Sequence, residues 1–275
     1  MPLSSSDFET QMMDVDGQVL RVGRQRGGGR PLLLFNGIGA NIEMLAPFAQ
    51  RLAGREIVTF DVPGVGHSLL PRFPYRLSTV ARLAARVLDR LGHADCDALG
   101  VSWGGAAAQQ FARSHAPRCR RLVLCATSAG AAMLPAHPRV LRKMLTPRRY
   151  MDEAYAREVA GDLYGGDFRS RPDLVAHVLR HVRWQSRLGY YLQLIAVWGW
   201  TSAYWLHRLE QPTLVMHGRD DPLVPLANAH LLGALIPRSE LRVVDCGHLF
   251  LLTRAEESAR AIDEFLNQPD ASWSF

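Results

Sequence analysis

Ser102 lies in the segment Gly100-Val101-Ser102-Trp103-Gly104, where an apolar run leads into a serine with a glycine two positions to either side. Small and helix-forming residues follow directly, so the segment predicts a strand, a very tight turn at Ser102 and a helix. Such a turn exposes the hydroxyl and points the N–H groups at the start of the helix toward the reacting oxygen. Chance produces this pattern often in a chain with 23 glycines, so other residues must support nucleophilic chemistry.

A serine hydroxyl becomes an effective nucleophile when a histidine, itself held by a carboxylate, removes its proton. His248 follows a predicted strand at residues 240–244, and Asp221 follows a predicted strand at residues 213–217. The carboxyl ends of parallel strands meet at one edge of a sheet, where Ser102 is also expected. We therefore predict Ser102 as nucleophile, His248 as base and Asp221 as the acid that orients it.

The acid has two rivals in the sequence, Asp220 and the weaker candidate Asp245. Asp221 is favoured because Pro222 restrains the chain immediately after it. The chain has ten histidines, and three others near predicted strand ends are expected to be structural: His67, His93 and His217.

Acyl transfer through a tetrahedral intermediate needs N–H donors directed at its oxyanion. The backbone N–H of Trp103, directly after the nucleophile, is one candidate. The loop after a buried strand at residues 31–35 should supply the other, most simply from Ile38, with Gly37 and Gly39 allowing close backbone approach.

Strands and helices alternate around these residues. A hairpin at residues 8–14 and 19–24 comes first, and apolar runs then predict buried strands at 31–35, 56–60, 97–101 and 121–127. Helical spacing predicts helices at 41–53, capped by Asn41, and at 77–91, capped by Ser78 and ended by Gly92. The order predicts an α/β fold with a mostly parallel sheet flanked by helices.

The alternation stops between residues 129 and 208, where helical patterns and aromatic residues replace strands, and resumes with helices at 226–235 and 254–266. We predict a sheet core built from residues 1–128 and 209–275, with residues 129–208 inserted as a helical cap. The last residues, 271–275, are expected to form a frayed tail.

Composition argues against several other classes of function. The net charge of +6 comes from scattered arginines with a single lysine, Lys143, whereas nucleic-acid binding calls for a basic stripe with aromatics. The sequence has no H-E-x-x-H or other metal-ligand spacing and no phosphate-binding loop, so no metal or cofactor is expected. Residues 188–206 lack formal charges but contain Gln193, two glycines and hydroxyl residues, which indicates a buried or interfacial segment and not a membrane span.

Cysteine usage and the first residues indicate location. Cys96, Cys119, Cys125 and Cys246 have neither C-x-x-C spacing nor the density of a disulfide framework, which favours a reducing compartment. Residues 1–17 carry four acidic side chains and no hydrophobic segment, so no signal peptide is expected. A cytoplasmic protein is predicted.

Eight segments carry motifs of one family: 35–41 (FNGIGAN), 60–66 (FDVPGVG), 100–106 (GVSWGGA), 147–150 (PRRY), 164–166 (YGG), 199–202 (GWTS), 220–225 (DDPLVP) and 247–251 (GHLFL). Together they resemble the α/β-hydrolase superfamily, and more narrowly the intracellular depolymerases of medium-chain-length polyhydroxyalkanoates. The asparagine at position 36, Trp103 and the motifs in the inserted region discriminate this branch, whereas the motifs around Ser102, Asp221 and His248 are common to many esterases. Ala107, Ala108 and His67 depart from the family pattern.

The resemblance implies hydrolysis of (R)-3-hydroxyalkanoic polyesters or oligoesters by the predicted triad, without a cofactor. An insoluble apolar polyester would meet an exposed apolar surface, so association with polymer granules is expected, and Trp198 and Trp200 are weak candidates for substrate contacts. Two alternatives stay open: a general carboxylesterase or lipase on smaller esters, and a non-catalytic small-molecule-binding protein of the same fold. The sequence does not specify the oligomeric state.

Overall fold

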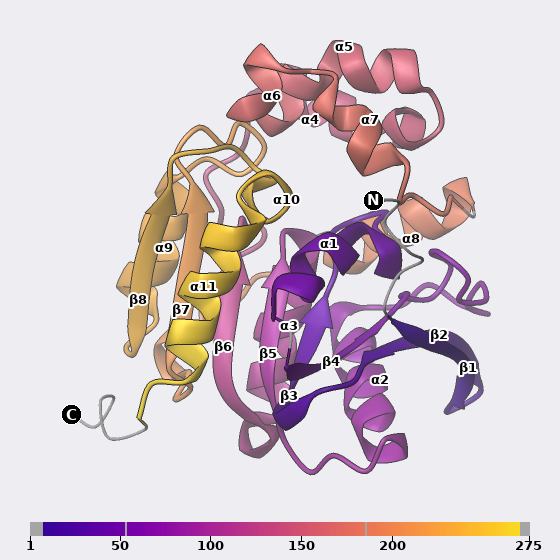
Figure 1. Ribbon diagram of the computed structural model, residues 1–275, viewed down its shortest axis with the longest axis vertical. Coiled ribbons are helices and arrows are strands. Elements are labelled where there is room, and N and C mark those ends of the chain that lie inside the picture. The colour runs from indigo at the N-terminus through magenta and orange to yellow at the C-terminus, as the bar shows by residue number, and fades with distance from the viewer. Residues whose placement is uncertain (1–7, 53, 185, 270–275) are drawn as a thin grey trace.

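An eight-stranded, mostly parallel sheet forms the centre of the structure, a computed structural model that describes residues 8–52, 54–184 and 186–269 (Figure 1). The strand order is β1-β2-β4-β3-β5-β6-β7-β8. The pairs β1–β2 and β2–β4 are antiparallel, and all other neighbouring strands run parallel. The predicted α/β fold with a mostly parallel sheet is therefore confirmed.

Each predicted strand is present, with boundaries shifted by a few residues. Asp16 and Gly17 join the first two strands with positive φ angles of 53° and 81°, as a tight two-residue hairpin turn requires. Every residue of β5 and β7 is buried, as expected of strands covered on both faces. The strands are Glu9–Val15 (β1), Gln18–Gln25 (β2), Gly28–Phe35 (β3), Arg55–Phe60 (β4), Cys96–Val101 (β5), Cys119–Cys125 (β6), Thr213–Gly218 (β7) and Ser239–Val244 (β8).

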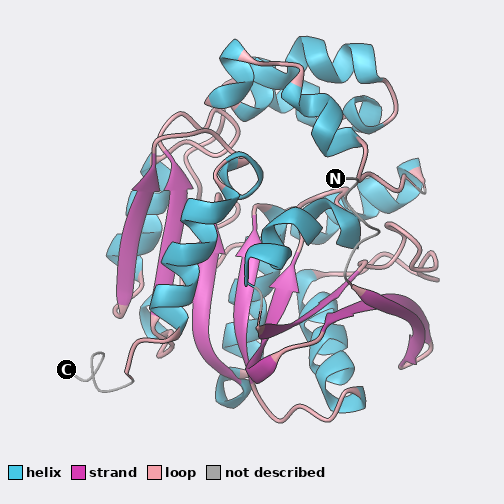
Figure 2. Ribbon diagram, viewed as in Figure 1, coloured by secondary structure: helices cyan, strands magenta, loops and turns pink. Residues whose placement is uncertain are grey.

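Helices cover both faces of the sheet (Figure 2). Leu33 and Phe35 of β3 pack in one apolar cluster with residues of α2, α3 and α9, whereas Leu32 and Leu34 pack in another with residues of α1, α10 and α11. This alternation follows from the two-residue period of a strand. One face carries α2 (Leu77–Arg90), α3 (Trp103–Ser114) and α9 (Ala227–Leu235); the other carries α1 (Ala46–Ala49), α10 (Phe250–Thr253) and α11 (Ala255–Leu266).

The chain between β6 and β7 is helical, and Figure 1 shows α4 to α7 gathered beyond the carboxyl ends of the parallel strands. Their apolar side chains form a third cluster that also includes Ala40 and Met44. Where this region begins and ends, Gly130 and Thr201 form an antiparallel bridge. Its helices are α4 (Pro138–Met144), α5 (Glu153–Tyr164), α6 (Asp167–Ser170), α7 (Leu174–Leu179) and α8 (Arg187–Val197), and the short 3-10 turns of the chain are η1 (Ile42–Leu45), η2 (Gln50–Leu52), η3 (Ala116–Arg118), η4 (Pro147–Tyr150) and η5 (Leu206–Arg208).

The predicted helix at 41–53 is wrong as a single element, and Ala53 lies outside the described residues. The chain instead forms η1, α1 and η2 in succession, because Pro47 near the start of α1 has no N–H to donate. Asn41 is not a side-chain cap: its Oδ1 accepts the N–H of Arg183 and its Nδ2 donates to the carbonyl of His181. The asparagine therefore joins this loop to the inserted region.

Two other helix-end predictions had different outcomes. Ser78 does not cap α2, since the helix begins one residue earlier and Thr79 Oγ1 accepts the N–H of Arg76 at 3.5 Å. Gly92 follows the end of α2 with φ 79°, which confirms the predicted stop. Cys125 and Cys246 are buried free thiols, and residues 271–275, expected to form a frayed tail, lie outside the described part.

Candidate active site

Ser102 forms the sharp turn between β5 and α3, with φ 54° and ψ −118°, a conformation that costs a non-glycine residue strain energy. Neither of the glycines two positions away has a positive φ angle. Close packing, and not the backbone conformation, is therefore what requires glycine at these positions. A Cβ on Gly100 would lie 2.3 Å from the carbonyl oxygen of Gly104. A Cβ on Gly104 would lie 2.2 Å from the carbonyl oxygen of Phe35. The helix can therefore start directly against the sheet only with glycine at both positions.

His248 and Asp221 contact each other, each on a loop that follows a strand. His248 Nδ1 lies 2.7 Å from Asp221 Oδ2, and both side chains are buried. The His248 loop is held by the end of α5, where the His248 N–H donates to the carbonyl of Tyr164 at 2.7 Å. Gly247 permits this contact, because a Cβ there would lie 1.9 Å from the same carbonyl oxygen.

The surroundings of Asp221 keep it ionised. Its Oδ1 accepts the backbone N–H groups of Leu223 and Val224, both at 2.9 Å. Burial by itself would raise the pKa of Asp221, but the charge of His248, the charge of His217 and the side-chain hydrogen bonds of both imidazoles to the carboxylate lower it to about 2. His217 Nε2 lies 3.4 Å from Asp221 Oδ2 and 2.7 Å from the Val224 carbonyl oxygen. His217, expected to be only structural, thus packs against the acid.

The two rival acids lie elsewhere. Asp220 forms a bidentate pair with Arg169, at 2.5 and 2.9 Å, and accepts the N–H of Gly166. Asp245 is almost fully exposed, with Arg219 3.7 Å away. Of the three candidates, Asp221 is the carboxylate that contacts His248.

The loop after β3 brings Ile38 to the same site. Gly39 has φ 71°, and a Cβ on it would lie 2.6 Å from the Tyr150 ring, so only glycine fits this position. Gly37 has ordinary van der Waals surroundings, and the expectation that it too is needed for close approach is not supported. Trp103 is the first residue of α3, so its N–H has no partner within the helix.

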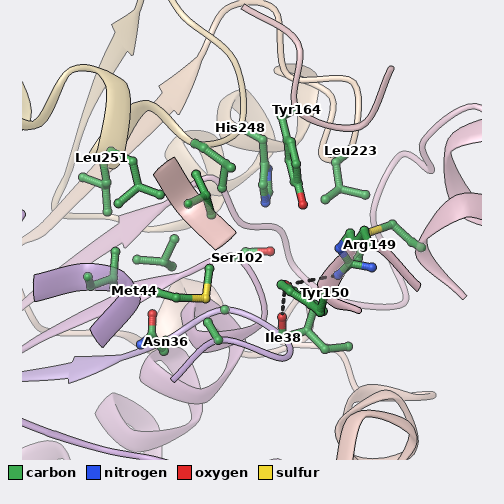
Figure 3. A pocket seen from close by; sticks show the side chains of 18 residues that line it. Asn36, Ile38, Met44, Ser102, Arg149, Tyr150, Tyr164, Leu223, His248 and Leu251 are labelled. Carbon is green, nitrogen blue, oxygen red and sulfur yellow. Dashed lines mark hydrogen bonds between the residues drawn. The ribbon is translucent and has the colours of Figure 1, made fainter. Parts of the chain in front are cut away.

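A pocket opens at Ser102 between the sheet and the inserted helices (Figure 3). No Asp or Glu lines it among the described residues, and most of its wall is apolar. Ser102 and His248 both line it, without a hydrogen bond between them; such contacts often tighten only when substrate is bound. The lining residues are Asn36, Gly37, Ile38, Ala40, Met44, Leu45, Val101, Ser102, Met144, Arg149, Tyr150, Tyr164, Val178, Leu223, His248, Leu249, Leu251 and Leu252.

The inserted region holds the Ile38 loop through residues that the sequence did not single out. The Tyr150 hydroxyl donates to the carbonyl of Ile38 at 2.7 Å. Gln193 of α8 accepts the N–H of Gly39 through its side chain, at 2.7 Å, and its carbonyl accepts the Trp103 indole N–H, at 2.8 Å. Tyr150 belongs to the 147–150 motif, but a glutamine within an apolar helix offers no comparable signal.

Trp198 and Trp200, the weak candidates for substrate contacts, are not brought to this pocket. Both line a separate surface depression between α2 and the end of α8. Trp200 Nε1 donates to Gln110 at 2.9 Å and its ring packs edge-on against Trp205, while Trp198 is 78% exposed. Hydrogen bonding to α3 directs Trp200 away from Ser102.

Residues 8–52, 54–184 and 186–269 contain neither a cluster of metal ligands nor a membrane-spanning helix. No group of three or more His, Cys, Asp or Glu side chains there is placed to hold a metal ion. No helix in that part of the chain is long and apolar enough to cross a membrane.

The chain is similar in sequence and in fold to known hydrolases. A family profile for the alpha/beta hydrolase fold matches residues 30–255. A poly(3-hydroxyalkanoate) depolymerase from Ectopseudomonas oleovorans is 49% identical over 93% of this chain and 92% of its own length. A 2-hydroxymuconate semialdehyde hydrolase from Pseudomonas sp. (strain CF600) is 28% identical over 90% of each chain. The crystal structure of the enol-lactonase from Burkholderia xenovorans LB400 superposes with a TM-score of 0.80 at 23% identity, covering 94% of this chain and all of its own.

Proposed function

Because the chain belongs to the α/β-hydrolase family, we propose that it is a serine ester hydrolase in which Ser102, Asp221 and His248 form the catalytic triad. The observation that carries this proposal is the 2.7 Å contact of His248 Nδ1 with an ionised Asp221, in the pocket that Ser102 lines. With Nδ1–H donated to the carboxylate, Nε2 is the nitrogen left to accept a proton.

The first half-reaction forms an acyl-enzyme. His248 Nε2 takes the proton of Ser102 as Oγ bonds to the ester carbonyl carbon, and the carbonyl electron pair moves to its oxygen. The backbone N–H groups of Ile38 and Trp103 stabilise this oxyanion, each by about 3 kcal/mol. When the intermediate collapses, the alcohol oxygen leaves with the proton from His248, and the acyl group stays on Oγ.

The second half-reaction returns the enzyme to its starting state. Water gives a proton to His248 Nε2 while its oxygen bonds to the acyl carbon. Collapse breaks the bond to Ser102 Oγ, which recovers the proton from His248. The acid leaves as a carboxylate at neutral pH, so each cycle consumes one ester bond and one water.

The substrate we propose is a poly- or oligoester of medium-chain 3-hydroxyalkanoic acids. The 49% identity to a poly(3-hydroxyalkanoate) depolymerase across nearly the whole chain supports this choice over a general carboxylesterase or lipase. The largely apolar pocket wall suits alkyl side chains. The inserted region, 129–208, acts as a cap over this pocket.

Contact with polymer granules is proposed through α8. Leu188, Tyr191 and Ile195 on this helix and Trp198 directly after it are exposed and spaced as one helical face. A water-insoluble polyester offers an apolar surface that this face would cover. The protein would then act in the cytoplasm, on granules.

The test is the Ser102→Ala variant beside the wild type, with fluorophosphonate labelling, p-nitrophenyl octanoate and amorphous poly(3-hydroxyoctanoate) granules. We expect labelling of the wild type at Ser102, release of hydroxyacid from granules and a loss of more than about 10³-fold in kcat for the variant. Full activity in the variant would refute the mechanism. Cleavage of the simple ester without release of hydroxyacid from granules would refute the proposed polymer substrate and favour a general carboxylesterase. Absence of both labelling and ester cleavage would favour a non-catalytic binding protein.

A further inference from the structure

Arg149 is a buried cation in the wall of the Ser102 pocket. It lies in η4 with a relative exposure of 2%. Its guanidinium donates to the hydroxyl of Tyr190 at 2.9 Å, the carbonyl of Thr146 at 3.3 Å and the hydroxyl of Tyr150 at 3.3 Å. These partners are all neutral.

No acidic side chain pairs with Arg149 in the described part of the chain, and its buried Nε has no hydrogen-bond partner. Arg21, by contrast, is a less buried arginine that contacts Glu43 at 2.6 Å and Asp61 at 3.6 Å. Burying a charge without an opposite charge is energetically unfavourable. A site that keeps such a cation beside a nucleophile is suited to an anionic ligand.

Aromatic rings orient this cation without neutralising it. The guanidinium carbon lies 4.4 Å from the centre of the Tyr150 ring and 5.3 Å from that of Tyr190. Figure 3 shows Arg149, Tyr150 and Tyr164 on one side of the pocket, with Met44 and Leu251 across from them. Apolar side chains therefore face the Arg149 cation across the pocket, and Leu223 lies on the same side as the cation.

We propose that Arg149 binds a substrate carboxylate, the free carboxyl terminus of a 3-hydroxyalkanoate oligoester. This inference rests on the proposed ester hydrolase function and adds a preference for acid-terminated chains. Each hydrolysis leaves chains with a carboxylate at one end, and the planar guanidinium matches that group better than any neutral terminus. The apolar side chains across the pocket would contact the alkyl branches.

The test compares two dimers of 3-hydroxyoctanoic acid that share one ester bond, one ending in the free acid and the other in the primary amide. The monomer released is measured at pH 8. For the wild type we expect kcat/KM to favour the acid by about 10- to 100-fold, the range of a hydrogen bond to a charged group. Arg149→Gln should bring the ratio of acid to amide close to one, and Arg149→Lys should keep part of it. Arg148→Gln, a neighbouring exposed arginine paired with Asp152, is the matched control and should keep the full ratio.

A purely structural role for Arg149 would lower both rates together and leave the ratio unchanged, which would overturn the proposal. Equal kcat/KM values for the two dimers in the wild type would overturn it without any variant. Calorimetric binding of 3-hydroxyoctanoate and its amide to the wild type gives a readout independent of catalysis: tighter binding of the acid supports the proposal, and equal binding refutes it. Failure of the proposed function is distinct, since no dimer would then be cleaved and Ser102 would not be labelled.

Discussion

Replacing Asp221 by asparagine removes one charge without changing shape, and the surrounding hydrogen bonds decide how the amide sits. The N–H groups of Leu223 and Val224 both donate to Oδ1, so the amide oxygen must stay there and its NH₂ group must face His248. His248 Nδ1 then has to accept a hydrogen bond, and the ring proton moves to Nε2. In that tautomer His248 cannot take the proton of Ser102, and we expect kcat to fall by about 10⁴.

The pKa of Asp221 sets the size and the pH range of the effect on stability. The folded pKa of about 2 lies below the ordinary value of 3.8, and this difference corresponds to about 2 kcal/mol. Because the folded pKa is lowered, the stabilisation is present above about pH 4 and is lost as the pH falls through 2. When the pH is lowered from 5 to 3, the free energy of unfolding should therefore decrease less for Asp221→Asn than for the wild type.

Rates on p-nitrophenyl octanoate and urea denaturation at several pH values measure both effects. Asp220→Asn is the matched control, because that side chain pairs with Arg169 and does not contact His248. We expect its kcat within about threefold of the wild type, and its fluorophosphonate labelling to persist. An Asp221→Asn enzyme with a tenth or more of the wild-type kcat, or an equal loss in Asp220→Asn, would refute the assignment.

Three further variants test the packing at Ser102, the support of the Ile38 loop and the exposed face of α8. Gly104→Ala should cost at least about 3 kcal/mol of stability and abolish activity, because the added methyl carbon would overlap a β3 carbonyl oxygen at 2.2 Å; urea denaturation measures it. Gln193→Met should cost about 1–3 kcal/mol and lower kcat, since it leaves the buried N–H of Gly39 without its acceptor. Replacing Leu188 and Trp198 by serine should weaken granule binding about tenfold or more in sedimentation assays, because two exposed apolar side chains are lost.

Two of these variants have a control in the same chain. Gly233→Ala, in α9 with no atom nearer than 4.0 Å to the added carbon, should stabilise by about 0.5–1 kcal/mol. A Gly104→Ala protein as stable as this control would contradict the packing argument, and unchanged stability and kcat in Gln193→Met would contradict the role of that amide. Tyr204→Ser is the control for the α8 variant, because Tyr204 is 81% exposed and lies outside α8. This protein should bind granules like the wild type. Equal loss in that variant would show that the effect is not specific to α8.

Local rules explain why the sheet was predictable from the chain alone. Apolar runs such as Leu32–Leu34 can be buried on both faces only inside a covered parallel sheet, so they indicate strand and environment together. The tight turn at Ser102 is equally local, because glycines at two fixed positions allow helix and strand to touch. Ser102, Asp221 and His248 each follow a predicted parallel strand, and this position predicted that all three would lie at one edge of the sheet.

Contacts between distant segments were decided only by the tertiary structure. Asp220 and Asp221 are adjacent residues of the same type, but they have different partners in the fold. Asp220 pairs with Arg169, whereas Asp221 bonds to His248 and to two backbone N–H groups. Arg149 is an ordinary basic residue in the sequence, and its burial among neutral partners depends on how η4 and α8 pack. Sequence alone thus determined the succession of strands and helices along the chain and the chemistry available at Ser102. Folding decided which charges are paired and which face the pocket, because pairing depends on distances across the chain that no local pattern encodes.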